Sequence, residues 1–276
     1  MNSSMSDPMD REVAVFSAAR RLPAGERATL EKRLLGNESP AVAASLNRLA
    51  RFLYDQGKFA DAETGYREAL MITRKLRGNE HIEVADALDW LVIVLAPQHQ
   101  AAEAEALQRE ALKIRRKLLG HEHPSVANAL INLAIPLAEQ GKLAEAESVD
   151  REAVEMRRKL LGSDCPEVAA ALHNLVRVLV GQGKLDEAET MQREAVAILR
   201  NLRGTDHPEV ANSLCRLGII FRDEGKLNDA ETLQREVLAI RRKLLGDEHA
   251  DVANSLCNLA LVLKRIKLSP PLLRPV

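Results

Sequence analysis

The phrase RKLLG occurs three times in the chain, as RKLLGHEHP at residues 116–124, RKLLGSDCP at 158–166 and RKLLGDEH at 242–249. Its glycine belongs to a series with a constant spacing of 42 residues: Gly36, Gly78, Gly120, Gly162, Gly204 and Gly246. Recurrence in one register predicts a repeat protein, in which copies of one supersecondary unit stack on one another. We expect five full repeats at 40–81, 82–123, 124–165, 166–207 and 208–249, and a half-repeat at 250–264.

The first half of each repeat predicts an amphipathic helix. Val210, Leu214, Leu217 and Phe221 are four, three and four residues apart, which places them on one helix face. Proline opens this helix in four repeats, where its missing N–H costs nothing. A Gly-Lys pair closes it in four repeats, since glycine can take the left-handed conformation that ends a helix. One leucine of this face recurs as Leu46, Leu88, Leu130, Leu172, Leu214 and Leu256.

The second half of each repeat predicts another helix. Its buried stripe in repeat three is Ala146, Val149, Ala153, Met156 and Leu160. A small residue at the same place in every repeat indicates a close helix crossing: Ala62, Ala104, Ala146, Ala188 and Ala230. On the face that we expect to be solvated, a glutamate precedes an arginine by four residues in each repeat: Glu63/Arg67, Glu105/Arg109, Glu147/Arg151, Glu189/Arg193 and Glu231/Arg235. Each pair should add about 0.2–0.5 kcal/mol.

Helix pairs of this kind cannot bury their apolar stripes alone, but stacked pairs can. The sequence therefore predicts an all-α fold, an α-solenoid of antiparallel helix pairs stabilised mainly by contacts between neighbouring repeats.

Composition excludes several classes of protein. The 276 residues include 39 Lys+Arg and 40 Asp+Glu, and this balance argues against a nucleic-acid binder. Three cysteines are too few for a disulfide scaffold. The sequence has neither an apolar run long enough to span a membrane nor a signal peptide, so we expect a soluble cytoplasmic protein with no membrane or nucleic-acid partner.

The repeat resembles the 42-residue tetratricopeptide repeat of kinesin light chains and their bacterial relatives. The matching residues are His207-Pro208, Val210-Ala211, Leu214, Leu217, Gly225-Lys226, Ala230-Glu231, Arg235-Glu236 and Arg241–Gly246. The resemblance covers residues 36–264. It implies a right-handed superhelix whose inner groove binds peptides or proteins, and it implies no catalysis.

Some residues depart from this pattern. Residues 97–100 replace the Gly-Lys turn of repeat two, which predicts an irregular turn. Pro136 falls inside the first helix of repeat three and removes one helical hydrogen bond, at a cost of about 3 kcal/mol unless a kink is accommodated. The aromatic residue expected in the second helix survives only as Tyr66. Elsewhere it is replaced by Gln108, Asp150, Gln192 and Gln234.

Residues 1–35 are expected to be a helical lead-in that caps the first repeat, and residues 265–276 a proline-containing tail. Within the lead-in, Arg11–Leu30 resembles a helical segment found ahead of kinase domains in some bacterial Ser/Thr kinases, but no kinase motif follows. Because the tail cannot supply a second helix, we expect an uncovered apolar flank on the half-repeat, and self-association through it is left open.

The resemblance places groove-facing residues on the first helices. In the related repeats they occupy the positions of Ala44, Asn47, Arg48, Arg51 and Tyr54 and their equivalents 42 residues on. The resulting candidates for peptide binding are Asn47, Arg48, Arg51, Trp90, Asn128, Asn132, His173, Asn174, Arg177, Asn212, Arg216 and Arg222.

These residue types suit peptide capture. An asparagine amide both donates and accepts, so it can pair with an extended backbone. Arginine can bind a carboxylate through two parallel hydrogen bonds. Basic residues outnumber Asp86 and Asp89 at these positions, which predicts an acidic or carboxylate-ended segment as ligand, with Trp90 a hydrophobic contact beside the acidic repeat two.

Alternative functions are left open by the sequence. The groove residues can be ordinary solvated side chains without a specific ligand. The chain can be a regulatory fragment of a bacterial signalling protein, such as a Ser/Thr kinase with a repeat tail, or a self-assembling structural protein. The sequence names neither the partner nor the pathway.

No catalytic or metal site is predicted, and no cofactor. The chain has no GxxxxGK[ST], GxSxG, HExxH or CxxC motif, so we do not expect an enzyme. His81, His123, His207 and His249 lie one or more repeats apart, too far to share a zinc ion, and we expect them to serve as loop and cap residues. Cys165, Cys215 and Cys257 are expected to be free thiols.

Overall fold

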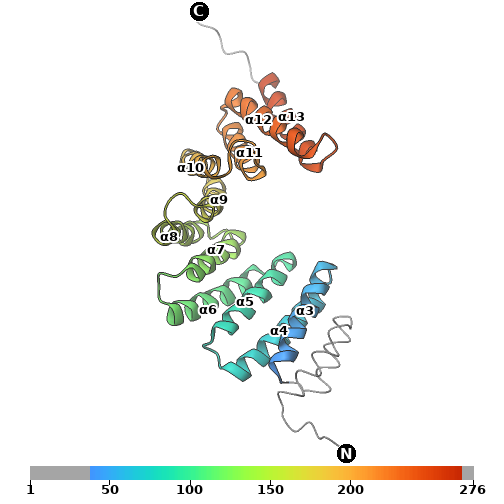
Figure 1. Cartoon of the computed structure of the whole chain (residues 1–276), viewed down its shortest axis with the longest axis vertical. Helices are drawn as coiled ribbons and strands as arrows, with labels where there is room; N and C mark the ends of the chain where they lie inside the picture. The colour runs from blue at the N-terminus through green and yellow to red at the C-terminus, as the bar shows by residue number, and fades with distance from the viewer. Residues whose placement is uncertain (1–37, 269–276) are drawn as a thin grey trace, which may run out of the picture. The chain divides into compact units, whose positions relative to one another are not determined.

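The computed structural model describes residues 38–268, and within that range it contains eleven α-helices, one short 3-10 turn and no strand. Consecutive helices pack against each other as pairs (Figure 1). The predicted all-α fold is therefore confirmed. The chain forms two compact parts, Met1–Gln140 and Gly141–Val276.

The N-terminal part holds repeats one and two and the first helix of repeat three. Short turns reverse the chain, so that α4 packs antiparallel on α3 and α6 on α5. Successive pairs pack through α4 and α5, and through α6 and α7. The helices are α3 (Pro40–Asp55), α4 (Phe59–Arg77), α5 (Ile82–Leu95), α6 (Ala101–Leu119) and α7 (Pro124–Glu139).

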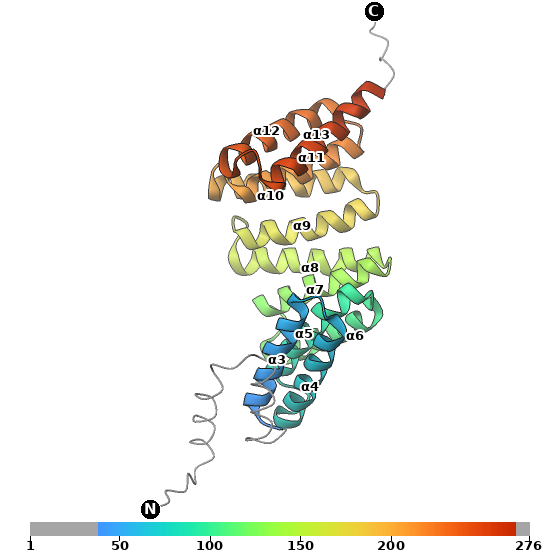
Figure 2. The ribbon, with the colours of Figure 1, turned by 90° about the vertical axis from the view of Figure 1, so that its right-hand side faces the viewer.

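The C-terminal part continues the same scheme. The α9/α10 and α11/α12 hairpins are repeats four and five, and Figure 2 shows α9 between α8 and α10. The last helix, α13, packs mainly on α12 and ends at Leu268. The helices are α8 (Leu143–Leu161), α9 (Pro166–Gly181), α10 (Leu185–Arg203), α11 (Pro208–Asp223), α12 (Leu227–Leu245) and α13 (Ala250–Leu268).

Local signals fix where the first helices begin and end. Nδ1 of His207 accepts the backbone N–H of Glu209 at 3.2 Å, and His81, His123 and His249 cap their helices in the same way. The prediction that these histidines are caps is confirmed. Gly183 (φ 74°) and Gly225 (φ 82°) take the left-handed conformation in the turns that follow α9 and α11.

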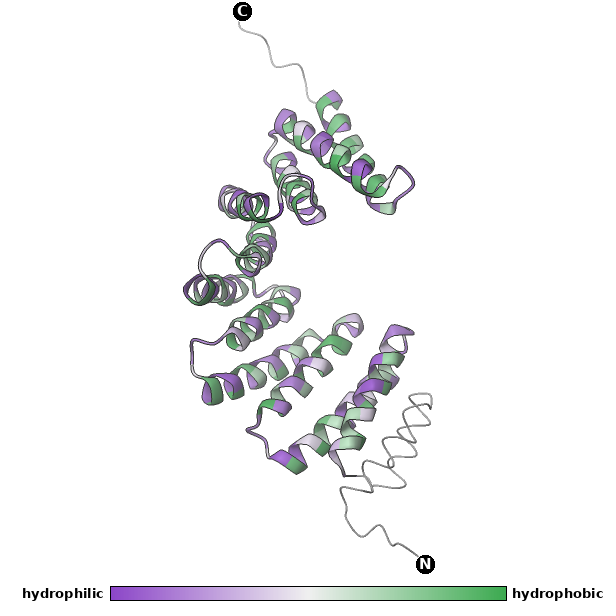
Figure 3. Ribbon diagram, viewed as in Figure 1, coloured by the Kyte–Doolittle hydropathy of each residue, from purple (hydrophilic) through white to green (hydrophobic). Residues whose placement is uncertain are grey.

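The core lies between the helices of each part. Leu172, Leu175 and Leu179 are at most 1% exposed, as the helical spacing predicts. Burying each such side chain contributes about 1.5–3 kcal/mol. Figure 3 shows hydrophobic and hydrophilic residues alternating along the helices. The recurrent alanines of the second helices are also buried, as expected for a position where helices cross: Ala62, Ala104, Ala146, Ala188 and Ala230.

Within each compact part, charged side chains join neighbouring repeats. The five predicted Glu–Arg pairs within second helices all form. The expectation that they face solvent throughout is wrong for their glutamates, because the side chain of Glu147 is only 14% exposed. Glu147 also accepts a hydrogen bond from Lys184 of the next repeat, at 2.7 Å, and this bond holds the pKa of its carboxyl at about 2.

The departures from the repeat have local effects. After α5 the chain forms a 3-10 turn (Ala96–Gln98), and His99 takes a left-handed conformation (φ 57°), so the predicted irregular turn is confirmed. Pro136 lies inside α7, which continues past it to Glu139.

Among residues 38–268, no second helix pairs with α13 as α10 and α12 pair with α9 and α11. Leu256 is 43% exposed, whereas the equivalent Leu172 and Leu214 are at most 1% exposed. The predicted lead-in at residues 1–35, including its kinase-like segment, and most of the predicted tail lie outside the described residues.

Candidate functional site

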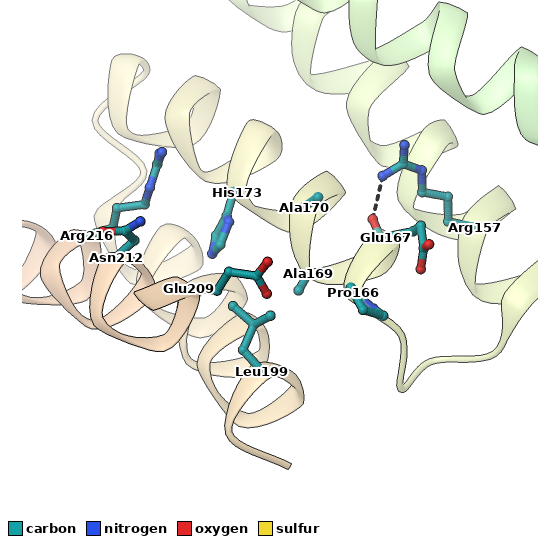
Figure 4. Close-up of a pocket in the computed structure, with 10 residues that line it drawn as sticks. All are labelled: Arg157, Pro166, Glu167, Ala169, Ala170, His173, Leu199, Glu209, Asn212 and Arg216. Atoms are coloured by element: carbon teal, nitrogen blue, oxygen red, sulfur yellow. Dashed lines mark hydrogen bonds between the residues drawn. The ribbon is translucent and has the colours of Figure 1, made fainter. Parts of the chain in front are cut away.

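A cavity of about 470 Å³ lies between the first helices α9 and α11 of the C-terminal part (Figure 4). Three predicted groove residues line it, namely His173 from α9 and Asn212 and Arg216 from α11. Figure 4 shows these three at one end of the cavity and Arg157 and Glu167 at the other. The structure thus brings together part of the predicted site.

His173 is fixed by a buried hydrogen-bond network. Its Nε2 lies 3.0 Å from Oγ of Ser213, which is fully buried. Nε2 of Gln192 donates to the same oxygen at 2.9 Å and to the Ser213 carbonyl at 2.8 Å. Burial lowers the pKa of His173 to about 4, and the charge of Arg216 adds to this shift. The imidazole is therefore neutral at pH 7 and offers hydrogen bonds rather than charge.

The two arginines of the cavity differ in their contacts. Arg157 reaches in from α8, and its Nη1 donates to the carbonyl oxygen of Glu167 at 2.5 Å. Arg216 makes no hydrogen bond or ion pair with any residue that the structure describes. Its guanidinium is exposed at the cavity and retains all its donors.

The other candidates of the C-terminal part do not line this cavity. Arg177 follows His173 by one turn of α9 and is exposed, with no hydrogen bond or ion pair to the described residues. Asn174 is half-buried on the same helix. Arg222 sits near the end of α11, where its Nε donates to Asp223 at 2.9 Å and its carbonyl accepts from Arg265 at 2.8 Å.

In the N-terminal part, a cavity of about 230 Å³ lies between α3 and α5. It contains the candidates Asn47 and Trp90. Oδ1 of Asn47 is buried without a hydrogen-bond partner among the described residues. Trp90 is 39% exposed and stacks on Tyr66, with 6.3 Å between ring centroids. This cavity therefore offers an acceptor and an aromatic surface.

A further cavity of about 290 Å³ lies between α5 and α7 and is lined mainly by apolar residues. The candidate Asn132 borders it together with Pro136, which has no N–H to donate to the Asn132 carbonyl. Asn128 is exposed one turn earlier on α7. Oε1 of Gln108 is buried beside this cavity and has no hydrogen-bond partner within residues 38–268.

The remaining candidates lie along α3. Nη2 of Arg48 donates to Oγ of Ser45 at 2.6 Å. Arg51 forms an exposed ion pair with Asp55 at 3.1 Å. Neither residue is among those that line the three cavities described above.

Part of the negative charge predicted for repeat two is balanced by a buried arginine. Nη2 of Arg115 lies 2.9 Å from Asp86 and 2.5 Å from Asp89, and the arginine side chain is only 6% exposed. Although burial opposes it, the hydrogen bonds and charges of both aspartates raise the pKa of Arg115. One guanidinium thus balances one of the two negative charges, and Asp86, whose side chain is 59% exposed, still lines the cavity between α3 and α5.

Sequence reasoning missed polar residues on the buried side of the second helices. Arg115 and Arg241 are at most 9% exposed and bond to first helices. Gln108, Asp150, Gln192 and Gln234 are at most 1% exposed. Their recurrence at fixed places in the repeat, above all the first arginine of the IRRK phrase, was the available signal.

The cysteine and metal expectations can be compared directly with the structure. Cys165, Cys215 and Cys257 are free thiols, as predicted. Among the described residues, no three His, Cys, Asp or Glu side chains are grouped so that they could hold a metal ion.

Models of the tetratricopeptide repeat match the sequence over residues 42–83 and, in overlapping segments, over 83–268. The chain belongs to the tetratricopeptide repeat family. Such repeats form protein–protein interaction scaffolds, and the stacked helix pairs of this chain are of that kind.

Solved tetratricopeptide structures show the same fold. The nearly identical TPR-like repeats of a Podosopora anserina protein described as a putative kinesin light chain are 26% identical, with a TM-score of 0.68, over 75% of this chain and 99% of that one. A single-substitution variant of those repeats is also 26% identical, with a TM-score of 0.67, over 72% of this chain and 94% of that one.

BtubC (BKLC) of P. vanneervenii is 23% identical, with a TM-score of 0.67, over 87% of this chain and 93% of that one. At this identity the likeness shows the fold alone. A search of curated proteins finds no match. No helix between residues 38 and 268 is long and apolar enough to cross a bilayer.

Proposed function

We propose that this tetratricopeptide repeat protein is a non-catalytic scaffold that binds an acidic or carboxylate-bearing segment of a peptide or protein along its first helices. The observation that carries the proposal is the pair Arg177 and Arg216, whose guanidinium groups make no ion pair with the described residues. A guanidinium binds a carboxylate through two parallel hydrogen bonds. Asn212 and neutral His173 lie beside Arg216 and add uncharged hydrogen-bonding groups.

Other arginines of the chain are paired with acidic residues, which distinguishes them from Arg177 and Arg216. Arg74, Arg158 and Arg200 lie on second helices and donate to glutamates of the following repeat at 2.6–2.8 Å. Arg115 is neutralised by Asp86 and Asp89. Arg177 and Arg216 stand apart, because their first-helix positions leave them without such partners. An anionic ligand is therefore expected in the C-terminal part of the chain.

Fluorescence anisotropy with a labelled hexaglutamate peptide tests the proposal. We expect the wild type to bind this probe more tightly than hexaglutamine, and the double variant Arg177→Glu, Arg216→Glu to lose that binding. A charge-matched control is Arg235→Glu, Arg242→Glu on the second helix α12, where both side chains are at least 50% exposed. Equal loss in both double variants, or none in the first, would count against the proposed site.

Self-association is a second candidate function, favoured by α13. Leu256 is exposed, whereas an antiparallel helix of the same repeat covers the equivalent leucines of α9 and α11. A second copy of α13 can cover this face in an antiparallel pair, which brings the acidic first turn (Asp251) of one helix toward the basic last turn (Arg265, Lys267) of the other. Sedimentation at several concentrations tests this candidate, and a strict monomer would remove it.

A further inference from the structure

One position of the second helix decides how the space between successive first helices is filled. At intervals of 42 residues it is occupied by Thr73, Arg115, Arg157, Leu199 and Arg241. Three repeats therefore carry a long cationic side chain at this point, and two carry a shorter neutral one. The difference matters because the side chain at this position extends from the second helix toward the first helices.

In two of the three repeats that carry arginine, the side chain fills this space, whereas Arg157 of repeat three is half-buried and lines the far end of the cavity beside Leu199. In repeat five, Nη2 of Arg241 donates to Oδ1 of Asn212 on α11 at 2.7 Å. Its Nη1 donates to Oγ of Ser255 at 2.9 Å and to the carbonyl of Asp251 at 3.0 Å, both on α13. The guanidinium is thus held between two first helices. Arg115 is similarly buried against α5.

Where the arginine is missing, a cavity lies at the same place. Leu199 lines the cavity of about 470 Å³ between α9 and α11, and Thr73 lines the cavity of about 230 Å³ between α3 and α5. The residues around Leu199 correspond to those around Arg241. Ala170 takes the place of Asn212 and Ser213 the place of Ser255, so the alanine leaves further room.

The end of the Leu199 cavity formed by α9 and α11 presents hydrogen-bond donors. Arg216 contributes its guanidinium. Asn212 already accepts a hydrogen bond from Arg241 through Oδ1, which leaves its NH₂ group to donate. Gln192 donates to Ser213, so the serine hydroxyl can give its hydrogen to Nε2 of His173 and leave Nδ1–H as the donor of that ring. Glu209 of α11 also lines the cavity, but its carboxylate lies 3.5 Å from Arg203, so the three donors remain available to a bound carboxylate.

On the basis of the function proposed above, we propose that Leu199 is a specificity-determining residue. By standing where other repeats carry arginine, it leaves a cavity that admits a carboxylate-bearing side chain of the bound segment. The carboxylate is bound by Arg216, Asn212 and His173, and the stem of the side chain contacts Leu199 and Ala170. A cavity of about 470 Å³ is within the range of small-ligand sites and exceeds one amino-acid side chain.

The test introduces into repeat four the arginine and asparagine that fill this space in repeat five. The double variant Ala170→Asn, Leu199→Arg reproduces the Asn212–Arg241 pair, with Ser213 at the position of Ser255. Because the variant adds a positive charge, simple electrostatics would strengthen binding of labelled hexaglutamate. We expect the opposite, an affinity lower by about tenfold or more, because the carboxylate loses its charge-assisted hydrogen bonds. Ala197→Arg adds the same charge to an exposed position of α10 and should not weaken binding.

Folding of each variant is checked by circular dichroism and thermal melting. If the double variant Ala170→Asn, Leu199→Arg is poorly folded, Ala170→Leu fills the same cavity without charge and should cause the same loss of affinity for hexaglutamate. If Ala170→Asn, Leu199→Arg is folded and binds with wild-type affinity, the proposed role of the cavity is overturned. Loss of binding in Arg177→Glu, Arg216→Glu would still support the proposed function. A wild type that does not bind hexaglutamate would overturn both.

Discussion

Nε2 of His173 lies 3.0 Å from Oγ of Ser213, and this contact joins the first helices of repeats four and five beside the cavity. Ser213 is fully buried and also accepts from Gln192 of the intervening second helix. Three helices thus meet in one hydrogen-bond network. Because the imidazole is largely buried and lies near the charge of Arg216, protonation of His173 opposes this packing.

We predict that His173 titrates far below an ordinary histidine. Burial, with a contribution from Arg216, lowers its pKa to about 4. The unfolded chain therefore binds more protons between about pH 6.5 and pH 4, and stability falls as the pH drops through this window by on the order of 3 kcal/mol. The imidazole resonance of His173 should stay constant in NMR spectra above about pH 6.

The variant His173→Gln provides the control, because glutamine can still bond to Ser213 without titrating. Its unfolding free energy should depend less steeply on pH between about 6.5 and 4 than that of the wild type. A His173 resonance that moves near pH 6.5, or parallel pH profiles in the two proteins, would contradict the prediction.

We predict that Asp150→Asn stabilises the protein at alkaline pH. Asp150 is 1% exposed, and neither carboxylate oxygen has a hydrogen-bond partner among the described residues. Burial raises its pKa to about 7, although the charge of Arg177 opposes the shift. Since the folded state binds the extra proton, the wild type loses stability as pH rises from about 4 to 7, by on the order of 4 kcal/mol.

Thermal melts of Asp150→Asn and the wild type at several pH values measure this effect. The advantage of the variant should be largest near pH 8 and should disappear near pH 4, where the native carboxyl is already neutral. Asp150→Gln restores the residue found at this place in three other repeats and serves as a second comparison. An advantage that does not change with pH would show that packing, rather than charge, is responsible.

The fold was predictable because the same sequence signals recur in several repeats. The apolar residues three and four apart, the proline and histidine at helix starts and the glycine at turns all specify local structure, and each is found as predicted. Arg115, Asp150 and Arg241 were not predictable in the same way, because an amphipathic pattern assigns charged residues to the exposed face. Their burial depends on the reach of one side chain to another helix, which spacing does not encode.

The candidate site, like the fold, was predictable only in part. The family resemblance placed His173, Asn212 and Arg216 on the groove face of the first helices, and in the structure all three line one cavity. They could not show that Arg115 pairs with Asp86 and Asp89, because the arginine and the aspartates lie on different helices of repeat two. The volume of the cavity also depends on Leu199, a second-helix residue that resembles ordinary core in the sequence.

We predict that Arg115→Leu is strongly destabilising. The substitution leaves Asp89, whose side chain is 24% exposed, without its guanidinium partner. Removing one partner of a buried ion pair costs about 3–5 kcal/mol, and we expect the lower end of that range because Asp86 is well solvated. Urea unfolding of Arg115→Leu and of Arg115→Leu with Asp89→Asn measures the cost. The second variant should recover most of the lost stability, and failure to recover would mean that Arg115 acts mainly through packing.

The ion pairs between second helices should behave differently from the Arg115 cluster. Arg200 on α10 donates to Glu236 on α12 at 2.6 Å, but both side chains are more than a third exposed. Because water screens such a pair, Arg200→Gln should cost less than about 1 kcal/mol and the difference should vanish near 1 M NaCl. The cost of Arg115→Leu should persist at the same salt concentration, since its guanidinium is buried. Urea unfolding at low and high salt compares the two variants. A loss of stability in Arg200→Gln that does not depend on salt would mean that these outer pairs, rather than the buried arginines, stabilise the repeats.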